Sequence, residues 1–215
     1  MDQITSLPRS RAGRPTREQA EARHAELLET ALDHFLDRGF EQATIEAIAA
    51  SVNMTKRTVY ARYPDKASLF LAAVRRAIDR MIVPKGKLHA LAKDDLESTL
   101  VAVARLRLKQ LMTPEGLKLQ RIINTESYRF PEIFVEAYER GARPIIVFIA
   151  DQLRRHAAPG SIAASNPEQA AAAFMSEVVG GPVRFAVSGN FMSERKIEER
   201  IAFTVRLFIE GVKTV

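Results

Sequence analysis

The chain has no cysteine among its 215 residues, which excludes disulfide frameworks, thiolate catalysis and cysteine-ligated zinc sites. A reducing cytoplasm is the setting that this composition predicts. Long apolar runs are missing too, because no stretch reaches the ~18 residues that a membrane helix needs. The polar segment 1–18 lacks the apolar stretch of a secretory signal peptide. We therefore expect a cytoplasmic protein with no membrane partner.

The motifs of common enzymes and metal sites are also missing. The four histidines show no metal-ligand spacing, and there is no HExxH motif. No glycine-rich phosphate loop follows a strand, and no nucleophile elbow is present. We therefore expect neither an enzyme nor a bound metal or cofactor.

The chain shows helical periodicity almost throughout and no convincing strand pattern. The apolar run 145–149 lies inside a longer helical pattern and is interpreted as buried helix. A break is expected at Val83–Lys87, and Gly141 and Pro144 should kink or split one long helix. The fold class predicted is all-α, with helices at about 18–38, 45–52, 56–63, 65–81, 96–111, 114–125, 131–157, 167–188 and 193–213.

Positive charge is concentrated in two short segments. The net charge is +6, from 32 basic and 26 acidic residues. Residues 1–17 hold four arginines and one aspartate, and residues 53–66 hold four basic residues and one aspartate, so the remainder is neutral. Two basic segments on a neutral scaffold are typical of a phosphate-binding footprint. A solvated basic tail combined with a chance cluster is the alternative.

Residues 44–63 have the pattern of a helix-turn-helix. Thr44 and Thr55 are good N-caps for two short helices joined by a tight turn. Ala49 is small enough to let the helices approach at a steep angle. Asn53 stands in the turn, where a positive φ is needed, and asparagine tolerates that conformation best after glycine.

The outer face of the second of these helices is polar and basic. A short helix presented end-on to the major groove places its first residues on base edges and its backbone N–H groups near phosphates. An ordinary helical hairpin with a solvated basic face has the same periodicity and remains an alternative. The residues on this face are Lys56, Arg57, Thr58 and Tyr60.

The stretch from Thr44 to Phe70 resembles the signature of the TetR/AcrR family of transcriptional regulators. The positions that agree in register are Ile48, Ala49, Thr55, Val59, Tyr60, Tyr63, Lys66 and Leu69, and the preceding helix that ends at Phe40 fits as well. The resemblance covers about residues 18–75. Farther along, residues 128–132 and Gly141 resemble the effector domains of the AefR-like branch. Asn53 departs from the family, which usually has glycine there.

The resemblance implies an all-helical subunit of about nine helices in two domains. Residues 1–17 would form a flexible basic arm and residues 18–65 the DNA-binding domain. Residues 66–215 would form the effector-binding and dimerisation domain. The partners implied are double-stranded operator DNA, a second copy of the chain and a small lipophilic effector.

The resemblance also implies roles for single residues on DNA. Lys56, Arg57 and Thr58 would enter the major groove, and Thr55 belongs to the same contact set. Thr44, Tyr60, Tyr63 and Lys66 would contact phosphates, although both tyrosines have an alternative role in packing between helices. Arg11 and Arg14 would enter a narrow minor groove. A disordered, solubilising tail is the alternative for that arm.

The C-terminal helices provide two further sets of candidate residues. The apolar stripes of the last two helices would form a dimer interface, or else they would pack inside one subunit. Converging apolar residues would line an effector pocket, or else they would be core. The interface set is Phe174, Val178, Ile201, Val205, Phe208 and Val212. The pocket set is Leu108, Met112, Ile122, Phe134, Phe148 and Met175.

The function expected is that of a repressor, which binds a palindromic operator as a dimer and is released by the effector. A transcriptional activator of the same family is an alternative. A helical adaptor that binds protein is another, and salt-dependent binding to duplex DNA would separate it from a regulator.

Overall fold

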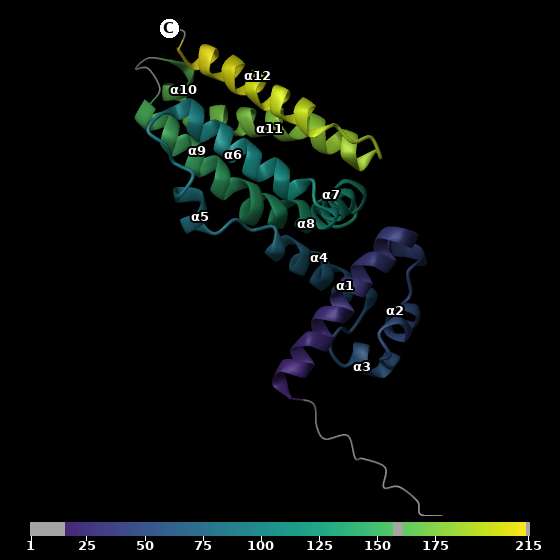
Figure 1. Cartoon of the computed structure of the whole chain (residues 1–215). Helices are drawn as coiled ribbons and strands as arrows, with labels where there is room; N and C mark the ends of the chain where they lie inside the picture. Colours follow the sequence, from purple (N-terminus) through teal and green to yellow (C-terminus); the bar gives the residue numbers. More distant parts are fainter. Residues whose placement is uncertain (1–15, 157–160, 214–215) are drawn as a thin grey trace, which may run out of the picture. The chain divides into compact units, whose positions relative to one another are not determined.

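The computed structural model describes residues 16–156 and 161–213, and every regular element in these ranges is helical (Figure 1). The all-α fold predicted from the sequence is therefore confirmed. The helices form two compact units, of which the first ends at Phe70 and the second begins at Leu71. The division falls inside one helix, a few residues beyond the boundary expected between 65 and 66.

The first unit contains three helices and the start of a fourth. Their bounds are α1 Arg17–Gln42, α2 Ile45–Ser51, α3 Lys56–Tyr60 and α4 Lys66–Arg80. Its core includes an aromatic cluster, in which the ring centroids of Phe35 and Phe70 lie 5.0 Å apart and those of Phe40 and Phe70 lie 5.3 Å apart. Aromatic burial of this kind anchors the small helical unit.

Gly39 interrupts α1 near its C-terminal end. Its φ of 74° is left-handed, a conformation that glycine adopts at little cost and that commonly ends a helix. The chain then makes one more turn before Ala43 caps the helix through its N–H, which donates to the carbonyl of Gly39. The kink turns Phe40 back toward the aromatic cluster, where it stacks against Phe35.

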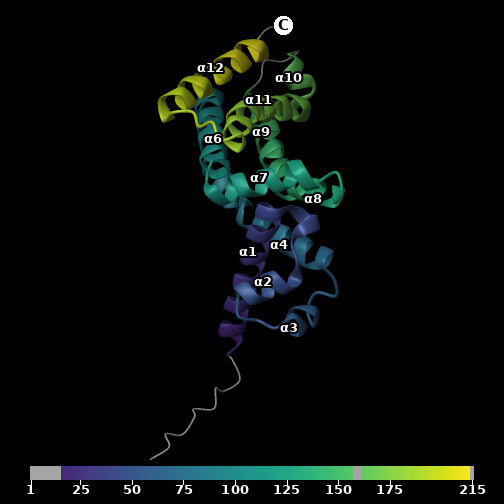
Figure 2. The ribbon, with the colours of Figure 1, turned by 90° about the vertical axis from the view of Figure 1, so that its right-hand side faces the viewer.

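The second unit is built from the rest of α4 and the following helices (Figures 1 and 2). α6 lies beside α9, and α11 packs against both α6 and α9. In both views α7 and α8 lie at one end of this unit and α10 at the other. The bounds are α5 Lys85–His89, α6 Leu96–Leu111, α7 Pro114–Glu126, α8 Pro131–Ala137, α9 Arg143–His156, α10 Ile162–Ser165, α11 Pro167–Val187 and α12 Glu194–Lys213.

A π-helical turn, η1 (Tyr138–Ala142), joins α8 to α9 in one continuous helical run. The kink expected at Gly141 and Pro144 takes this form, and π-turns often mark functional sites.

The number of helices agrees with the expectation of about nine. If α8, η1 and α9 are taken as one helix and the one-turn helices α5 and α10 are set aside, nine helices remain in the described part of the chain. The break expected at Val83–Lys87 is present but ends earlier, because α4 ends at Arg80 and α5 begins at Lys85.

α11 is long and apolar enough to cross a bilayer by length and composition alone. In this structure it is a core helix instead. It packs against α6, α9 and α12, and Phe174 and Val178 on its inner face are no more than 2% exposed. Packing between helices of the same unit therefore explains the buried face of α11, which is 39% of the apolar window.

Candidate functional site

Two N-caps and one left-handed residue position the helix-turn-helix. The hydroxyl of Thr44 accepts a hydrogen bond from the N–H of Ala47, and that of Thr55 accepts one from the N–H of Thr58. Such caps satisfy N–H groups that the first turn of a helix leaves unpaired. Asn53 has a φ of 53°, which confirms the conformation expected in the turn. Local sequence therefore sets where α2 ends and where α3 begins.

The first turn of α3 is presented to solvent. Thr55, Lys56, Arg57 and Thr58 are all exposed, whereas Val59 on the opposite side is fully buried against the rest of the unit. Tyr60 remains 40% exposed and is therefore accessible from solvent. A short helix anchored on one face and polar on the other is the geometry that groove recognition requires.

The two cations of α3 have different surroundings. The Lys56 ammonium pairs with the carboxylate of Glu46 on α2 and lies 5.4 Å from the centre of the Tyr60 ring. The hydrogen bond to Glu46 raises the pKa of Lys56 and lowers the pKa of Glu46. Arg57 makes no ion pair with any described residue. Of the two, Arg57 can contact DNA without first breaking an ion pair with another described residue.

Tyr63 is buried, in agreement with the packing alternative. It is 9% exposed, and its ring stacks on that of His24 with the phenol oxygen 2.5 Å from His24 Nε2. Burial raises the pKa of its phenol above the ordinary value. A phosphate contact by Tyr63 would require this contact between α1 and the α3–α4 loop to open.

Lys66, expected to contact phosphate, is held by the C-terminal turn of α1. Its ammonium donates to the carbonyl oxygen of Glu41 at 2.9 Å and lies 4.6 Å from the centre of the Phe40 ring. This contact combines a charge-assisted hydrogen bond with a cation–π interaction. The other two expected cations, Arg11 and Arg14, lie outside the described residues, as does the rest of the proposed arm except Thr16 and Arg17.

The second unit contains a partly open cavity of about 580 Å³. It lies among α4, α6, α7, α8, η1, α9 and α11, and its lining is mainly apolar. A cavity of this size suits a small organic molecule. Of the residues expected to form a pocket, the structure places Phe134 and Met175 on its wall.

The other four expected pocket residues do not line this cavity. Leu108, Ile122 and Phe148 are at most 5% exposed and fill the core, while Met112 packs against that core. The expectation failed because apolar periodicity identifies an inward-facing side chain but not the place where packing leaves a gap. Arg107, which the sequence analysis did not select, does line the cavity.

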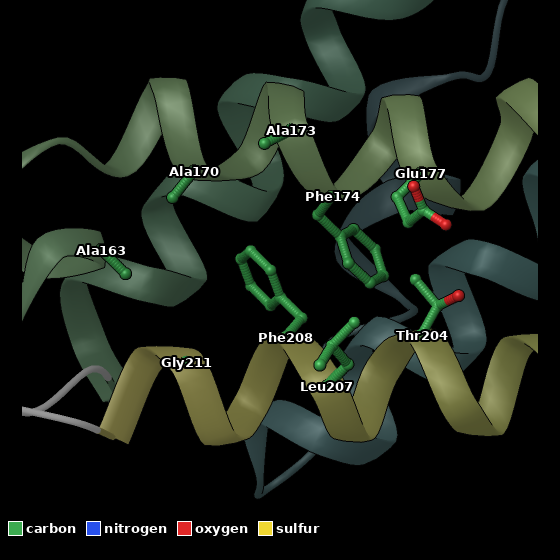
Figure 3. Close-up of a pocket in the computed structure, with 9 residues that line it drawn as sticks. All are labelled: Ala163, Ala170, Ala173, Phe174, Glu177, Thr204, Leu207, Phe208 and Gly211. Atoms are coloured by element: carbon green, nitrogen blue, oxygen red, sulfur yellow. The ribbon is translucent and has the colours of Figure 1, made fainter.

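Most of the expected interface residues are buried within the chain itself. Phe174, Val178, Ile201 and Val205 are at most 2% exposed, in agreement with the alternative that these stripes pack inside one subunit. The inner stripes of α11 and α12 face each other, with the rings of Phe174 and Phe208 5.0 Å apart between the helices (Figure 3). The side chain of Val212 lies outside the described part of the structure.

Apolar side chains on the outer side of these helices are exposed instead. Phe203 and Leu207 of α12 are 66% and 60% exposed, and Phe185 of α11 is 57% exposed. A hollow of about 460 Å³ beside Leu207 and Phe208 is lined largely by alanine and aromatic side chains (Figure 3). These exposed apolar side chains are the candidates for a surface that meets a partner.

Family models match both halves of the chain. Residues 27–73 match the model described as bacterial regulatory proteins of the tetR family. Residues 98–211 match the C-terminal domain of AefR-like transcriptional repressors.

Among curated proteins, an uncharacterised HTH-type regulator of Mycobacterium tuberculosis is 42% identical over 62 residues, which are 29% of this chain and 31% of that protein. YdeS of Bacillus subtilis is 33% identical over 76 residues, 35% of this chain and 37% of its own. The chain thus matches about a third of the length of these relatives.

Solved structures match almost the whole chain. A TetR-family regulator from Mesorhizobium loti has a TM-score of 0.70 at 23% identity, and the match covers 93% of this chain and 100% of that one. The flavonoid-responsive regulator FrrA has a TM-score of 0.65 at 26% identity, with 89% and 97% covered. Because the family models account for the helix-turn-helix and for most of the remaining helices, the chain belongs to the TetR family of bacterial transcriptional regulators.

Proposed function

We propose that this protein is a transcriptional repressor that binds a palindromic operator as a homodimer and releases it when a small lipophilic effector binds. The observation that carries the proposal is the exposed first turn of α3, with Thr55 to Thr58 held outward by the caps and by buried Val59. The repressor role is favoured because the matching C-terminal model describes repressors. The protein would act in the cytoplasm, where operator DNA lies.

The proposed effector site is the cavity of the second unit. Its size and apolar walls suit a drug-sized molecule. FrrA, which is 26% identical, is described as flavonoid-responsive, so a related fold responds to a small organic compound. The effector of this chain would act by favouring a conformation with weak operator affinity.

The proposed dimer uses the outer side of α11 and α12. Exposed Phe203 and Leu207 would bury their side chains against the same surface patch of a second copy, as a two-fold interface requires. Two-fold symmetry also presents two α3 helices to the two halves of a palindrome.

Selection of bound duplexes from a random pool tests the function directly. A palindromic motif bound by wild-type protein would support the proposal. Recovery of no motif, together with no salt-dependent binding to duplex DNA, would favour an adaptor that binds protein. A reporter gene placed behind the selected motif then separates repression from activation, since only a repressor lowers expression.

A further inference from the structure

The charged groups that line the cavity of the second unit are both cationic. Arg107 on α6 and Arg184 on α11 contribute to its wall, and no aspartate or glutamate does. The remaining polar lining comes from neutral side chains such as Gln120, Tyr138 and Ser176. An apolar cavity that contains only positive charge favours ligands of opposite charge.

Arg107 is the more deeply placed of the two arginines. It is 8% exposed, and burial lowers its pKa to about 10, so the guanidinium is still protonated at neutral pH. Its Nη2 points toward the π-helical turn, because a Cβ atom built on buried Gly141 would lie 3.9 Å from it. The cation therefore lies between α6 and η1 on the cavity wall.

Arg107 makes no ion pair with any residue in the described part of the chain. Its partner is the neutral side chain of Gln110, whose Oε1 accepts from Nη1 at 2.8 Å. Gln110 is fixed in that role because its own amide donates to the carbonyl of Met81 at 2.9 Å. A guanidinium has five N–H donors, so most of its hydrogen-bonding capacity is unused within the described part of the chain.

A buried charge without a counter-ion is unfavourable for folding, and proteins normally pair it. We infer that the ligand of this cavity is an amphiphilic organic acid, with an apolar body against the cavity wall and an anionic group on Arg107. Such a ligand supplies the acceptor that the protein lacks, in the bidentate geometry for which arginine is suited. The inference rests on the proposed function, since it names the class of effector.

Two fluorescent probes that differ in one anionic group test the inference. The anion is 1-anilinonaphthalene-8-sulfonate, and the neutral counterpart is N-phenyl-1-naphthylamine, which has the same rings without the sulfonate. In a purely apolar cavity the neutral probe binds better, because the sulfonate must be desolvated. With Arg107 as its partner, the anion is expected to bind full-length protein at least about tenfold more tightly.

Variants assign that preference to one residue. Arg107→Met is expected to weaken the anionic probe by roughly tenfold to hundredfold and to leave the neutral probe within about threefold. Arg105→Met is the matched control, because Arg105 lies on the same helix but is exposed and paired with Glu198 at 2.6 Å. It should change neither affinity.

Each alternative result has a defined meaning. The inference is overturned if wild type binds the two probes equally or binds neither. It is also overturned if Arg107→Met and Arg105→Met lose equal affinity. If Arg107→Met does not fold, the wild-type comparison decides alone. The same preparations are tested on the selected operator. Operator binding by a wild type that has no preference for the anion overturns only the ligand class, whereas failure to bind DNA overturns the proposed function.

Discussion

Arg57 and Lys56 are neighbours on α3, but only Lys56 has an acidic partner in the described structure. A free, planar guanidinium binds a base edge in the major groove well, because it can donate two N–H groups to guanine. Phosphate contacts, in contrast, add affinity without sequence information. The two kinds of contact should therefore respond differently to mutation.

Arg57→Ala is expected to relax the preference for one base pair in each half-site, at about 1–3 kcal/mol. Tyr60→Phe is the comparison, because loss of a phosphate contact weakens all duplexes alike. Fluorescence anisotropy on the selected operator and its single-base variants measures both. Equal losses for Arg57→Ala on operator and random DNA would remove Arg57 from base recognition.

Glu46→Gln is expected to strengthen binding to random DNA. The change removes the carboxylate that pairs with Lys56 and would itself be repelled by phosphate. Lys56 then becomes available to a phosphate, so the slope of log affinity against log salt should steepen by up to about 0.9. Glu26→Gln on α1 is an exposed control with the same change of charge. An unchanged slope relative to that control would show that Lys56 stays off the DNA.

Among single residues, the sequence identified those that shape the turn of the helix-turn-helix more reliably than those that contact partners. Asn53 and the two threonine caps were predictable because their effects are local. Tyr63 was ambiguous, since its partner His24 is 39 positions away. Arg107 did leave a signal, because it lies at helical spacing from Leu100, Val103 and Leu111, which are buried. A lone arginine on an apolar stripe indicates a buried cation.

Helices were predictable where caps and proline define their ends. α6 has the expected bounds, and α11 begins as expected at the Asn166–Pro167 pair. The one-turn helices α5 and α10 were missed, because four or five residues carry too little periodicity to recognise. The π-turn could be predicted only as a kink, since the choice between a break and a π-turn depends on packing around Gly141.

An ionic cluster joins the π-turn to α4. Arg140 pairs with Asp79 of α4 and with Glu136 at 2.7 Å, and Arg75 of α4 pairs with Glu136 at 2.9 Å. Burial opposes ionisation of Glu136, but its hydrogen bonds with Arg75 and Arg140 keep its pKa below the ordinary value. Because η1 also lines the cavity, this cluster connects the proposed effector site to the helix that begins in the DNA-binding unit.

Arg140→Met is expected to weaken the effect of ligand on DNA binding while leaving ligand-free operator affinity within about threefold. If the cluster carries about 1–1.4 kcal/mol of coupling, the ratio of operator dissociation constants with and without inducer falls about fivefold to tenfold. The inducer is an organic acid found by screening for operator release. Arg154→Met, which breaks an exposed pair with Asp151, is the control. An unchanged ratio would place the coupling elsewhere.

For the whole molecule, the sequence indicated that α11 and α12 carry apolar stripes but not what covers each stripe. Ile201 and Val205 meet the core of their own subunit, whereas Phe203 and Leu207 remain exposed. The same helical periodicity describes both arrangements, because a buried stripe does not reveal whether the same chain or a second copy covers it. Only the packed structure separates subunit core from outer surface.

The assembly can therefore be tested at Leu207, which is 60% exposed and belongs to the outer side of α12. In a dry two-fold interface, Leu207→Glu would bury two unpaired charges, which costs several kcal/mol. We expect a soluble, helical monomer by light scattering and circular dichroism. Such a monomer should lose the operator complex while keeping weak, salt-sensitive DNA binding, because one helix-turn-helix makes too few base contacts for specificity.

Tyr128→Glu is the matched control, because Tyr128 is a fully exposed aromatic residue outside α11 and α12. It should remain dimeric and bind operator as wild type does. Phe208 is less suitable for this test, since its ring packs on Phe174 and a charge there would disturb the subunit core. A Leu207→Glu protein that stays dimeric with full operator affinity would place the interface on another surface. A folded monomer that still shifts the palindrome would instead show that operator recognition does not depend on this contact.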